Sequence, residues 1–173
     1  MGMTALDPTP ALIAEGVWFN YPCGTPALRG VDLSVAAGRV TMILGRSGSG
    51  KTTLLKVLKG LLPIQRGAVR RYGASAAPST GMAYIPQTLG LVRSLSALEN
   101  VLTGALSQVG TLPSLFGAFP APVVAQARRL MEQLGISEKA EEPVSRLSGG
   151  QRQRVAIARA LIARPALILA DEF

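Results

Sequence analysis

A glycine-rich octapeptide, residues 45–52, constrains the fold of this 173-residue chain more than any other feature. It reads GRSGSGKT and matches the phosphate-binding pattern G-x-x-x-x-G-K-[ST] at every fixed position. The apolar run 40–44 before it predicts a strand buried on both faces. Residues 52–59 after it carry leucines at helical spacing and predict a helix that Gly60 ends. A chance turn rich in Gly and Ser would not need this context, so the pattern predicts a βα unit that binds phosphate.

Each residue type in the octapeptide suits phosphate binding. Glycines let successive backbone N–H groups turn toward phosphate oxygens, and the following helix presents its positive end. Lys51 supplies a point charge for the β- and γ-phosphates, and the Thr52 hydroxyl is a ligand for Mg²⁺. The predicted nucleotide-binding residues of this segment are Gly45, Ser47, Gly48, Ser49, Gly50, Lys51, Thr52 and Thr53.

Two acidic residues, Asp171 and Glu172, follow the last apolar run, 166–170. A carboxylate that leaves the C-terminal end of a buried parallel strand lies in the crevice where such sheets bind ligands. We expect Asp171 to hold Mg²⁺, Glu172 to polarise an attacking water and Lys51 to stabilise charge on the phosphate. Taken alone, the acidic pair could equally be a helix N-cap, but its combination with the phosphate loop favours the catalytic interpretation.

The composition limits the remaining chemistry. Histidine is absent, which excludes a His-based triad and an imidazole base, and the single Cys23 excludes an intramolecular disulfide. The net charge is +8, and two acid-free windows, 33–98 and 143–170, hold nine and five basic residues. Such windows are either solvated surface or parts of a site for a polyanion. Charge alone does not choose between a nucleotide, a nucleic acid and an acidic lipid.

Other elements follow from apolar periodicity and from capping residues. Alternation predicts antiparallel strands near 17–21 and 31–35, and short apolar runs predict buried strands at 82–85 and 166–170. An edge strand is expected at 69–72. Capping boxes at Ser96 and Ser148 predict two helix starts, and a further helix is expected at about 122–134. Residues 73–80 and 110–122 read as loops. The apolar face of the helix after Ser96 would include Leu98, Val101, Leu102 and Leu106.

The string 147–151, LSGGQ, places two glycines behind the capping serine of a helix, which makes an anion site. With the octapeptide and the pair Asp171 and Glu172, it resembles the nucleotide-binding subunits of ATP-binding-cassette (ABC) proteins over about 16–172. The resemblance implies that the string contacts the γ-phosphate of ATP held by a second subunit, so that a head-to-tail homodimer encloses two ATP with Mg²⁺. The string residues concerned are Ser148, Gly149, Gly150 and Gln151.

Two further residues take their roles from the resemblance alone. Gln87, after the strand expected at 82–85, matches the glutamine loop of the family, which senses Mg²⁺ and water and moves with the transmembrane partner. Gln87 is thereby implied as a catalytic residue and a metal ligand. Tyr21 matches the aromatic residue that stacks on adenine. Taken alone, Gln87 is equally an ordinary loop amide and Tyr21 a packed strand aromatic.

The resemblance also implies a fold: a P-loop NTPase α/β core, an N-terminal antiparallel β subdomain and a helical insertion at 91–146. All belong to one partial domain, 1–173, without the C-terminal core strands of the family. The strings 91–96, 99–102 and 114–120 are similar to the helical region of phosphonate-importer ATPases. The implied function is ATP hydrolysis that powers import of phosphonate or a related anion.

The partners implied by this resemblance are transmembrane permease subunits and, indirectly, a periplasmic or surface substrate-binding protein. The chain lacks a targeting signal and any run of 18 apolar residues, so we expect a cytoplasmic protein held peripherally on the inner face of the membrane.

Two alternatives stay open. A soluble ABC-type ATPase acting on nucleic acid or the ribosome would also explain the basic charge, although the sequence lacks a zinc insertion and basic–aromatic interleaving, so we expect no nucleic-acid partner. The other alternative is a nucleotide-binding fragment without turnover. It follows because the family continues past its catalytic glutamate to a further Asp loop and a switch histidine, whereas this sequence ends at Phe173.

Overall fold

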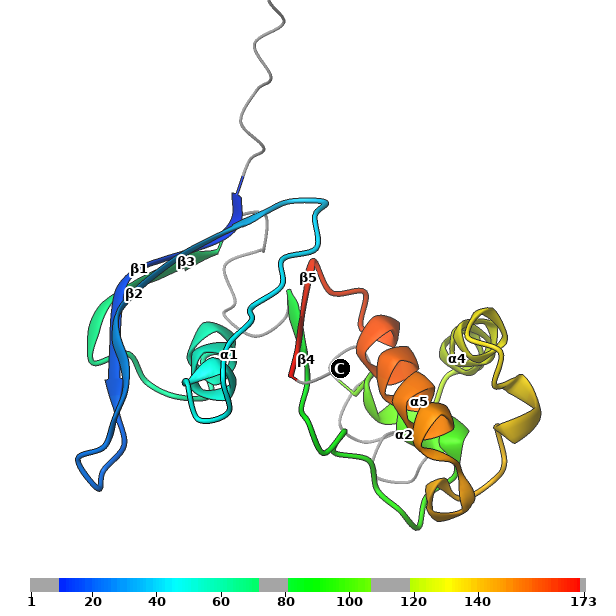
Figure 1. Cartoon of the computed structure of the whole chain (residues 1–173). Coiled ribbons are helices and arrows are strands. Elements are labelled where there is room, and N and C mark those ends of the chain that lie inside the picture. Colours follow the sequence, from blue (N-terminus) through cyan, green and yellow to red (C-terminus); the bar gives the residue numbers. More distant parts are fainter. Residues whose placement is uncertain (1–9, 72–80, 107–118, 172–173) are drawn as a thin grey trace, which may run out of the picture. The chain divides into compact units, whose positions relative to one another are not determined.

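The computed structural model describes residues 10–71, 81–106 and 119–171 (Figure 1). The chain divides into two compact units, Met1–Ser79 and Thr80–Phe173, and each is described by itself. Several expectations lie outside the described residues: Tyr72 at the end of the predicted edge strand, the loop at 73–80, most of the loop at 110–122, and Glu172.

The first unit contains a three-stranded antiparallel sheet in the order β2-β1-β3. The strands are β1 (Pro10–Asn20), β2 (Pro26–Ala36) and β3 (Arg66–Arg71). β1 and β2 pair antiparallel, as the sequence predicts, with Val17 opposite Val31, and β3 lies at an edge of the sheet. Leu12, Val17 and Phe19 of β1 are buried. A register shift between Ala14 and Val17 moves the alternation by one residue, so Leu12 before it and Val17 and Phe19 after it are all buried.

Helix α1 (Lys51–Lys59) begins at the last two residues of the octapeptide, which confirms the predicted helix. Its apolar residues Leu54, Val57 and Leu58 are buried, as their spacing indicates. Gly60 ends it at φ 85°, and its N–H donates to the Val57 carbonyl at 2.9 Å. The left-handed backbone conformation at this position favours glycine. The residue that ends α1 is therefore recognisable from the local sequence.

The predicted strand at 40–44 is wrong. These residues adopt no strand, and the side chains of Val40, Met42 and Leu44 are 93, 77 and 85% exposed. Their backbone makes no hydrogen bond to another described residue. An apolar run becomes a buried strand only when neighbouring strands pair with it, and no described strand does so here.

The second unit contains a parallel pair of strands, β4 (Met82–Ile85) and β5 (Leu167–Ala170), with Met82 opposite Leu167. Both strands lie where the apolar runs predict them. The strand expected to be buried at 166–170 is buried only in part, because Ile168 is 38% exposed while Leu169 is buried. With a single described neighbour, β5 buries alternate residues only.

Helices form the rest of the second unit. They are α2 (Ala97–Thr103), α4 (Ala121–Gln133), the short 3₁₀ helices η1 (Ser137–Lys139) and η2 (Val144–Arg146), and α5 (Gly149–Ile162). They share one apolar core that includes Val101, Met131 and Val155. Both capping boxes are present, at Ser96 and Ser148, as predicted.

One residue of the expected apolar face is misplaced. Leu106 is 45% exposed, because α2 ends at Thr103 and the chain turns at Gly104. Ala105 is fully buried in its place. Helical spacing therefore predicts inward positions only as far as the helix continues.

Candidate functional site

The glycine loop before α1 has the geometry that its sequence predicts for phosphate binding. Gly48 and Gly50 have φ values of 78° and 92°, which favour glycine. A Cβ on Gly50 would lie 2.6 Å from the carbonyl oxygen of Ala27, so a side chain there would displace backbone. Between these residues, the Ser49 N–H donates to the Arg46 carbonyl at 3.2 Å and closes the turn.

The N-terminus of α1 is open toward this loop. Its N-cap is Gly50, and no side chain caps it. The first i→i−4 hydrogen bond runs from the Leu54 N–H to the Gly50 carbonyl at 2.8 Å, so the N–H groups of Lys51, Thr52 and Thr53 precede the helical ladder. Because the first turn contains no acidic residue, the positive end of the helix is not neutralised there.

Lys51 adds a full positive charge to the same loop. Its Nζ donates to the carbonyl oxygens of Gly45 at 2.9 Å and Arg46 at 3.0 Å, so the side chain folds back over the start of the loop. An ammonium group and a helix N-terminus on one glycine loop form a phosphate-binding arrangement. The residues present therefore fit a nucleoside triphosphate. Ser47 and Thr52 lie in the same segment.

Tyr21 lies beside the first turn of α1, next to the phosphate loop. Its hydroxyl is 2.9 Å from the Thr53 hydroxyl, and its ring meets the Phe19 ring edge-on, with centroids 5.1 Å apart. Thr53 is 5% exposed and Tyr21 36% exposed. The structure thus brings the predicted adenine-binding aromatic to the predicted phosphate site. The Thr53 hydroxyl is engaged with Tyr21, which leaves its backbone N–H as the group suited to phosphate.

Gln87 and Asp171 follow the C-terminal ends of the neighbouring parallel strands β4 and β5, and Asp171 lies directly after its strand as the sequence predicts. Asp171 is 3% exposed, and its N–H donates to the Ile85 carbonyl at 3.0 Å. Gln87 is exposed in the turn after β4, where the Leu89 N–H donates to the Pro86 carbonyl at 2.7 Å. Glu172, the expected water-polarising residue, lies outside the described residues.

Tyr84 is a partner of Asp171 that the sequence analysis missed. Its hydroxyl donates to Asp171 Oδ2 at 3.3 Å. Burial, and next the negative charge of Asp171, raise the pKa of Tyr84 above its ordinary value. The two residues are 87 positions apart, so only the pairing of β4 with β5 reveals the contact.

The LSGGQ string begins α5 with a complete capping box. The Ser148 hydroxyl accepts from the Gln151 N–H at 3.3 Å, and the Gln151 side chain accepts from the Ser148 N–H at 2.8 Å. Gly149 and Gly150 are exposed, and a Cβ on either would have no neighbour within 4 Å. Packing within the chain therefore does not require these glycines, and they leave the backbone at the helix start open to an approaching anion.

In the described part of the chain, no group of three or more Cys, Asp and Glu side chains is placed to hold a metal ion. The predicted Mg²⁺ ligands are one hydroxyl, one amide and one carboxylate: Thr52 in the first unit, and Gln87 and Asp171 in the second. Oxygen ligands of this kind suit Mg²⁺, which takes few protein ligands and completes its shell with water and phosphate oxygens.

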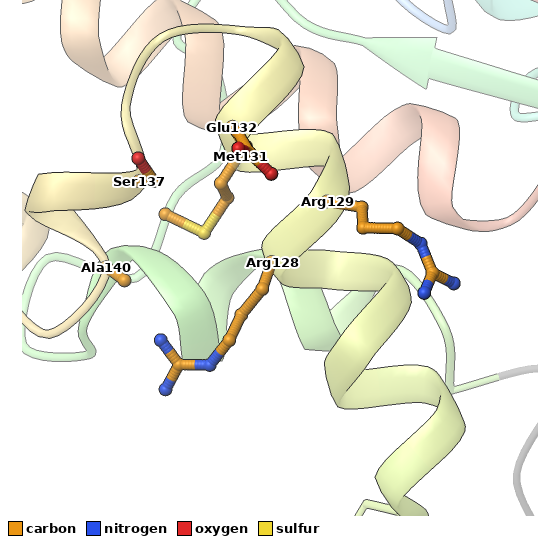
Figure 2. Close-up of a pocket in the computed structure, with 6 residues that line it drawn as sticks. All are labelled: Arg128, Arg129, Met131, Glu132, Ser137 and Ala140. Carbon is orange, nitrogen blue, oxygen red and sulfur yellow. The ribbon is translucent and has the colours of Figure 1, made fainter.

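A cavity of about 250 Å³ lies between α4 and η1 (Figure 2). Figure 2 shows Arg128 and Arg129 leaving α4 in different directions beside it. Arg128 forms an ion pair with Glu141 at 2.7 Å. None of the site residues predicted from the sequence lines this cavity, so it is separate from the predicted site.

Two polar side chains within the helical part also escaped the sequence analysis. Asn100 is fully buried; it accepts from the Val92 N–H at 2.8 Å and donates to the Ser96 carbonyl at 2.9 Å. Arg159 is half-buried on α5 and donates to the Leu89 and Gly90 carbonyls. Burial lowers the pKa of its guanidinium below the ordinary value. In the sequence, the one sign of either contact is a polar residue among the apolar residues of a predicted helix.

The phosphate loop and its helix place the chain among P-loop nucleotide-binding proteins. The family described as "ABC transporter" matches residues 28–173. Among curated relatives, the phosphonates import ATP-binding protein PhnC of Hyphomonas neptunium is 41% identical over 170 residues, which is 94% of this chain and 65% of the relative. PhnC of Thiobacillus denitrificans is 40% identical over 168 residues, with the same two coverages. This chain belongs to the ABC transporter family.

Solved structures agree with this assignment. A nucleotide-free ATP-binding cassette from an ABC transporter matches 94% of this chain and 69% of its own length, with a TM-score of 0.80 and 31% identity. The ADP conformation of MJ1267, an ATP-binding cassette of an ABC transporter, matches 92% and 67%, with a TM-score of 0.77 and 31% identity. The predicted fold class is confirmed. The chain spans about 65% of the length of the two PhnC relatives.

Proposed function

We propose that this chain is the ATP-binding part of a membrane importer in which ATP hydrolysis powers uptake of phosphonate or a related anion. The observation that carries the proposal is the phosphate loop, where Lys51 folds over the loop beside the uncapped N-terminus of α1. The names of the two PhnC relatives favour phosphonate import over an action on nucleic acid or the ribosome.

Phosphoryl transfer to water depends mainly on positioning and on neutralising charge. ATP with Mg²⁺ supplies the γ-phosphoryl group when bound. In this proposal Lys51 and the first-turn N–H groups of α1 hold the phosphates, and the exposed Tyr21 ring packs on adenine. Thr52, Gln87 and Asp171 hold Mg²⁺, and Glu172 orients the water.

A second copy of the subunit completes the proposed site. Ser148, Gly149, Gly150 and Gln151 would face the γ-phosphate bound by the other copy in a head-to-tail homodimer. Support comes from the two exposed glycines at the start of α5, which no contact within the described chain requires. Backbone N–H groups at a helix start bind an anion well when no side chain blocks the approach.

The remaining proposed partners are transmembrane permease subunits and, indirectly, a substrate-binding protein outside the membrane. No helix in the described ranges is long and apolar enough to cross a bilayer. In this proposal the permease crosses the membrane, and this chain is held against its inner face. Nucleic acid is not a partner in this proposal.

The test is ATP hydrolysis by the whole protein, assembled with its permease in lipid vesicles and supplied with the binding protein. We expect phosphonate to stimulate hydrolysis and to accumulate inside vesicles in which the ATP-binding subunit faces the interior. Glu172→Gln should abolish turnover while ATP still binds. Stimulation by RNA or DNA instead of phosphonate would contradict the proposal. Unchanged turnover in Glu172→Gln would contradict the role of that carboxylate.

A further inference from the structure

Arg159 fastens the turn that carries Gln87 to helix α5. Its guanidinium donates to the carbonyl oxygens of Leu89 and Gly90, in both cases at 2.5 Å. Leu89 and Gly90 come directly after the turn at 86–89, whose ends are joined by the hydrogen bond from the Leu89 N–H to the Pro86 carbonyl. One side chain of α5 thereby fixes the end of a four-residue turn in which Gln87 is the second residue.

The backbone conformation of Leu89 and Gly90 requires contacts that stabilise it. Leu89 has a φ of 62° and Gly90 a φ of 58°. The left-handed region costs a residue other than glycine roughly 1–2 kcal/mol, so Leu89 keeps this conformation only if surrounding contacts enforce it. The Leu89 side chain supplies a second contact, because it packs against the cluster of Ile85, Ala156 and Ala160. Polar and apolar contacts to α5 therefore act on the same turn.

We propose that Arg159 is a positioning residue that holds Gln87 in place for the reaction of Mg²⁺-bound ATP and couples it to α5, the helix that begins at Ser148. This inference rests on the proposed function, because it takes Gln87 as a metal ligand. Arg159 acts through the backbone of Leu89 and Gly90. Its loss would leave two carbonyls without their charged donor and a strained residue without its polar anchor, so Gln87 would sample other positions.

The chain offers a matched control for this role. Arg154, on the same helix, also donates to two successive carbonyls, those of Leu134 and Gly135, at 3.4 Å each. These carbonyls lie at the end of α4 and not in the Gln87 turn. Arg154→Met therefore removes the same residue type and the same kind of contact from α5 without touching the turn.

The experiment compares Arg159→Met, Arg159→Lys and Arg154→Met in the whole protein assembled with its membrane subunits. We expect Arg159→Met to lower kcat by about 10–100-fold, the usual loss when a residue behind a metal ligand is removed, with little change in KM for ATP. Arg159→Lys should regain part of the activity, because an ammonium group can still donate to one of the carbonyls. Arg154→Met should keep the wild-type kcat. If Arg159→Met does not fold, Arg159→Lys tests the inference: a lowered kcat with little change in KM for ATP supports it, and a wild-type kcat overturns it.

Hydrogen exchange at the Leu89 amide gives a readout that does not depend on turnover. We expect faster exchange in Arg159→Met than in Arg154→Met. Equal losses of kcat in the two methionine variants, or wild-type kcat in Arg159→Met, would overturn the inference while the proposed function stands. No ATP hydrolysis by the wild-type assembly is a different result, which would overturn the proposed function and the inference with it.

Discussion

The Tyr84 hydroxyl donates to Asp171 Oδ2 at 3.3 Å. Tyr84 lies on β4, and Asp171 directly follows β5, the strand that pairs with β4. The contact fixes the carboxylate at the end of β5, where the proposed metal ligand is needed. Asp171 is 3% exposed, and a buried carboxylate is stable only with polar partners. The hydroxyl of Tyr84 is one of these partners, so it supports the geometry of the site as well as the strand pair.

The raised pKa of Tyr84 predicts a pH-dependent stability. In the unfolded chain the group ionises near 10.0, whereas in the folded chain burial and Asp171 keep it neutral to higher pH. Its contribution to the free energy of unfolding is thus fully present below pH 10 and is lost as pH rises through the raised pKa. Chemical denaturation of wild type and Tyr84→Phe between pH 8 and about 11 measures it. A stability difference that stays constant over this range would contradict the assignment.

Gly104 predicts a packing effect that opposes helix propensity. A Cβ there would lie 2.0 Å from the Arg159 carbonyl oxygen and 2.8 Å from Ile162 Cγ2. Gly104 is the C-cap of α2 at φ −67°, a conformation open to any residue, and Ala has the higher helix propensity by about 1 kcal/mol in a helix interior. Forced overpacking, in contrast, costs about 1–3 kcal/mol. We expect Gly104→Ala to lower the free energy of unfolding, because α2 and α5 must separate.

The control for Gly104→Ala is Gly149→Ala, at the start of α5, where a Cβ meets nothing within 4 Å. Thermal or urea unfolding of the two variants separates packing from propensity. Gly149→Ala should leave the stability unchanged or slightly raised. Equal effects in both variants would show that the close approach of α2 to α5 is not what makes Gly104 necessary.

The capping box of α2 predicts a dependence on acid. The Ser96 N–H donates to Glu99 Oε2 at 2.7 Å, and this bond, followed by the Ser96 side chain, lowers the pKa of Glu99 below 4.5. The stabilisation is therefore present above pH 4.5 and is lost as pH falls through the lowered pKa. Ser96→Ala should cost about 1 kcal/mol at neutral pH. The stability difference between wild type and Glu99→Gln should shrink below pH 4.5; a difference that is unchanged at low pH would argue against a charged cap.

Local signals explain which parts of this fold were predictable. Lys51–Lys59 follows from the octapeptide, the leucine spacing and Gly60, all within about one helix length. The capping boxes at Ser96 and Ser148 are complete within four residues. The run at 40–44 failed because a strand requires partners from elsewhere in the chain, which apolar character alone does not provide.

The site divides in the same way. The phosphate loop was predictable because consecutive residues build it, and the position of Asp171 at the carboxyl end of its strand followed from the rule for ligand sites in parallel sheets. The contacts that hold these residues were not predictable. Tyr84 reaches Asp171 over 87 positions, and Arg159 reaches Leu89 over 70. Such pairs carry no local periodicity, and they become visible only when the strands and helices have packed.

Tyr21 gives a prediction for the adenine end of the proposed site. Its hydroxyl bonds to Thr53 at 2.9 Å, while about a third of the residue stays exposed. If the ring stacks on adenine, Tyr21→Ala should weaken ATP binding by about 1–3 kcal/mol, whereas Tyr21→Phe should keep the ring and most of the affinity. Titration with ATP, followed by fluorescence of a labelled nucleotide, compares the variants. Equal affinities for wild type and Tyr21→Ala would exclude stacking at this residue.

The central claim is that the loop at 45–52 binds the phosphates of ATP, and Lys51→Ala tests it most directly. Calorimetric titration of the chain with Mg²⁺ and ATP should show binding by wild type and none by Lys51→Ala, since the ammonium group over Gly45 and Arg46 is lost. Lys56→Ala removes an equal charge from the last turns of the same helix and should bind as wild type does. Equal affinity of wild type and Lys51→Ala would contradict the account.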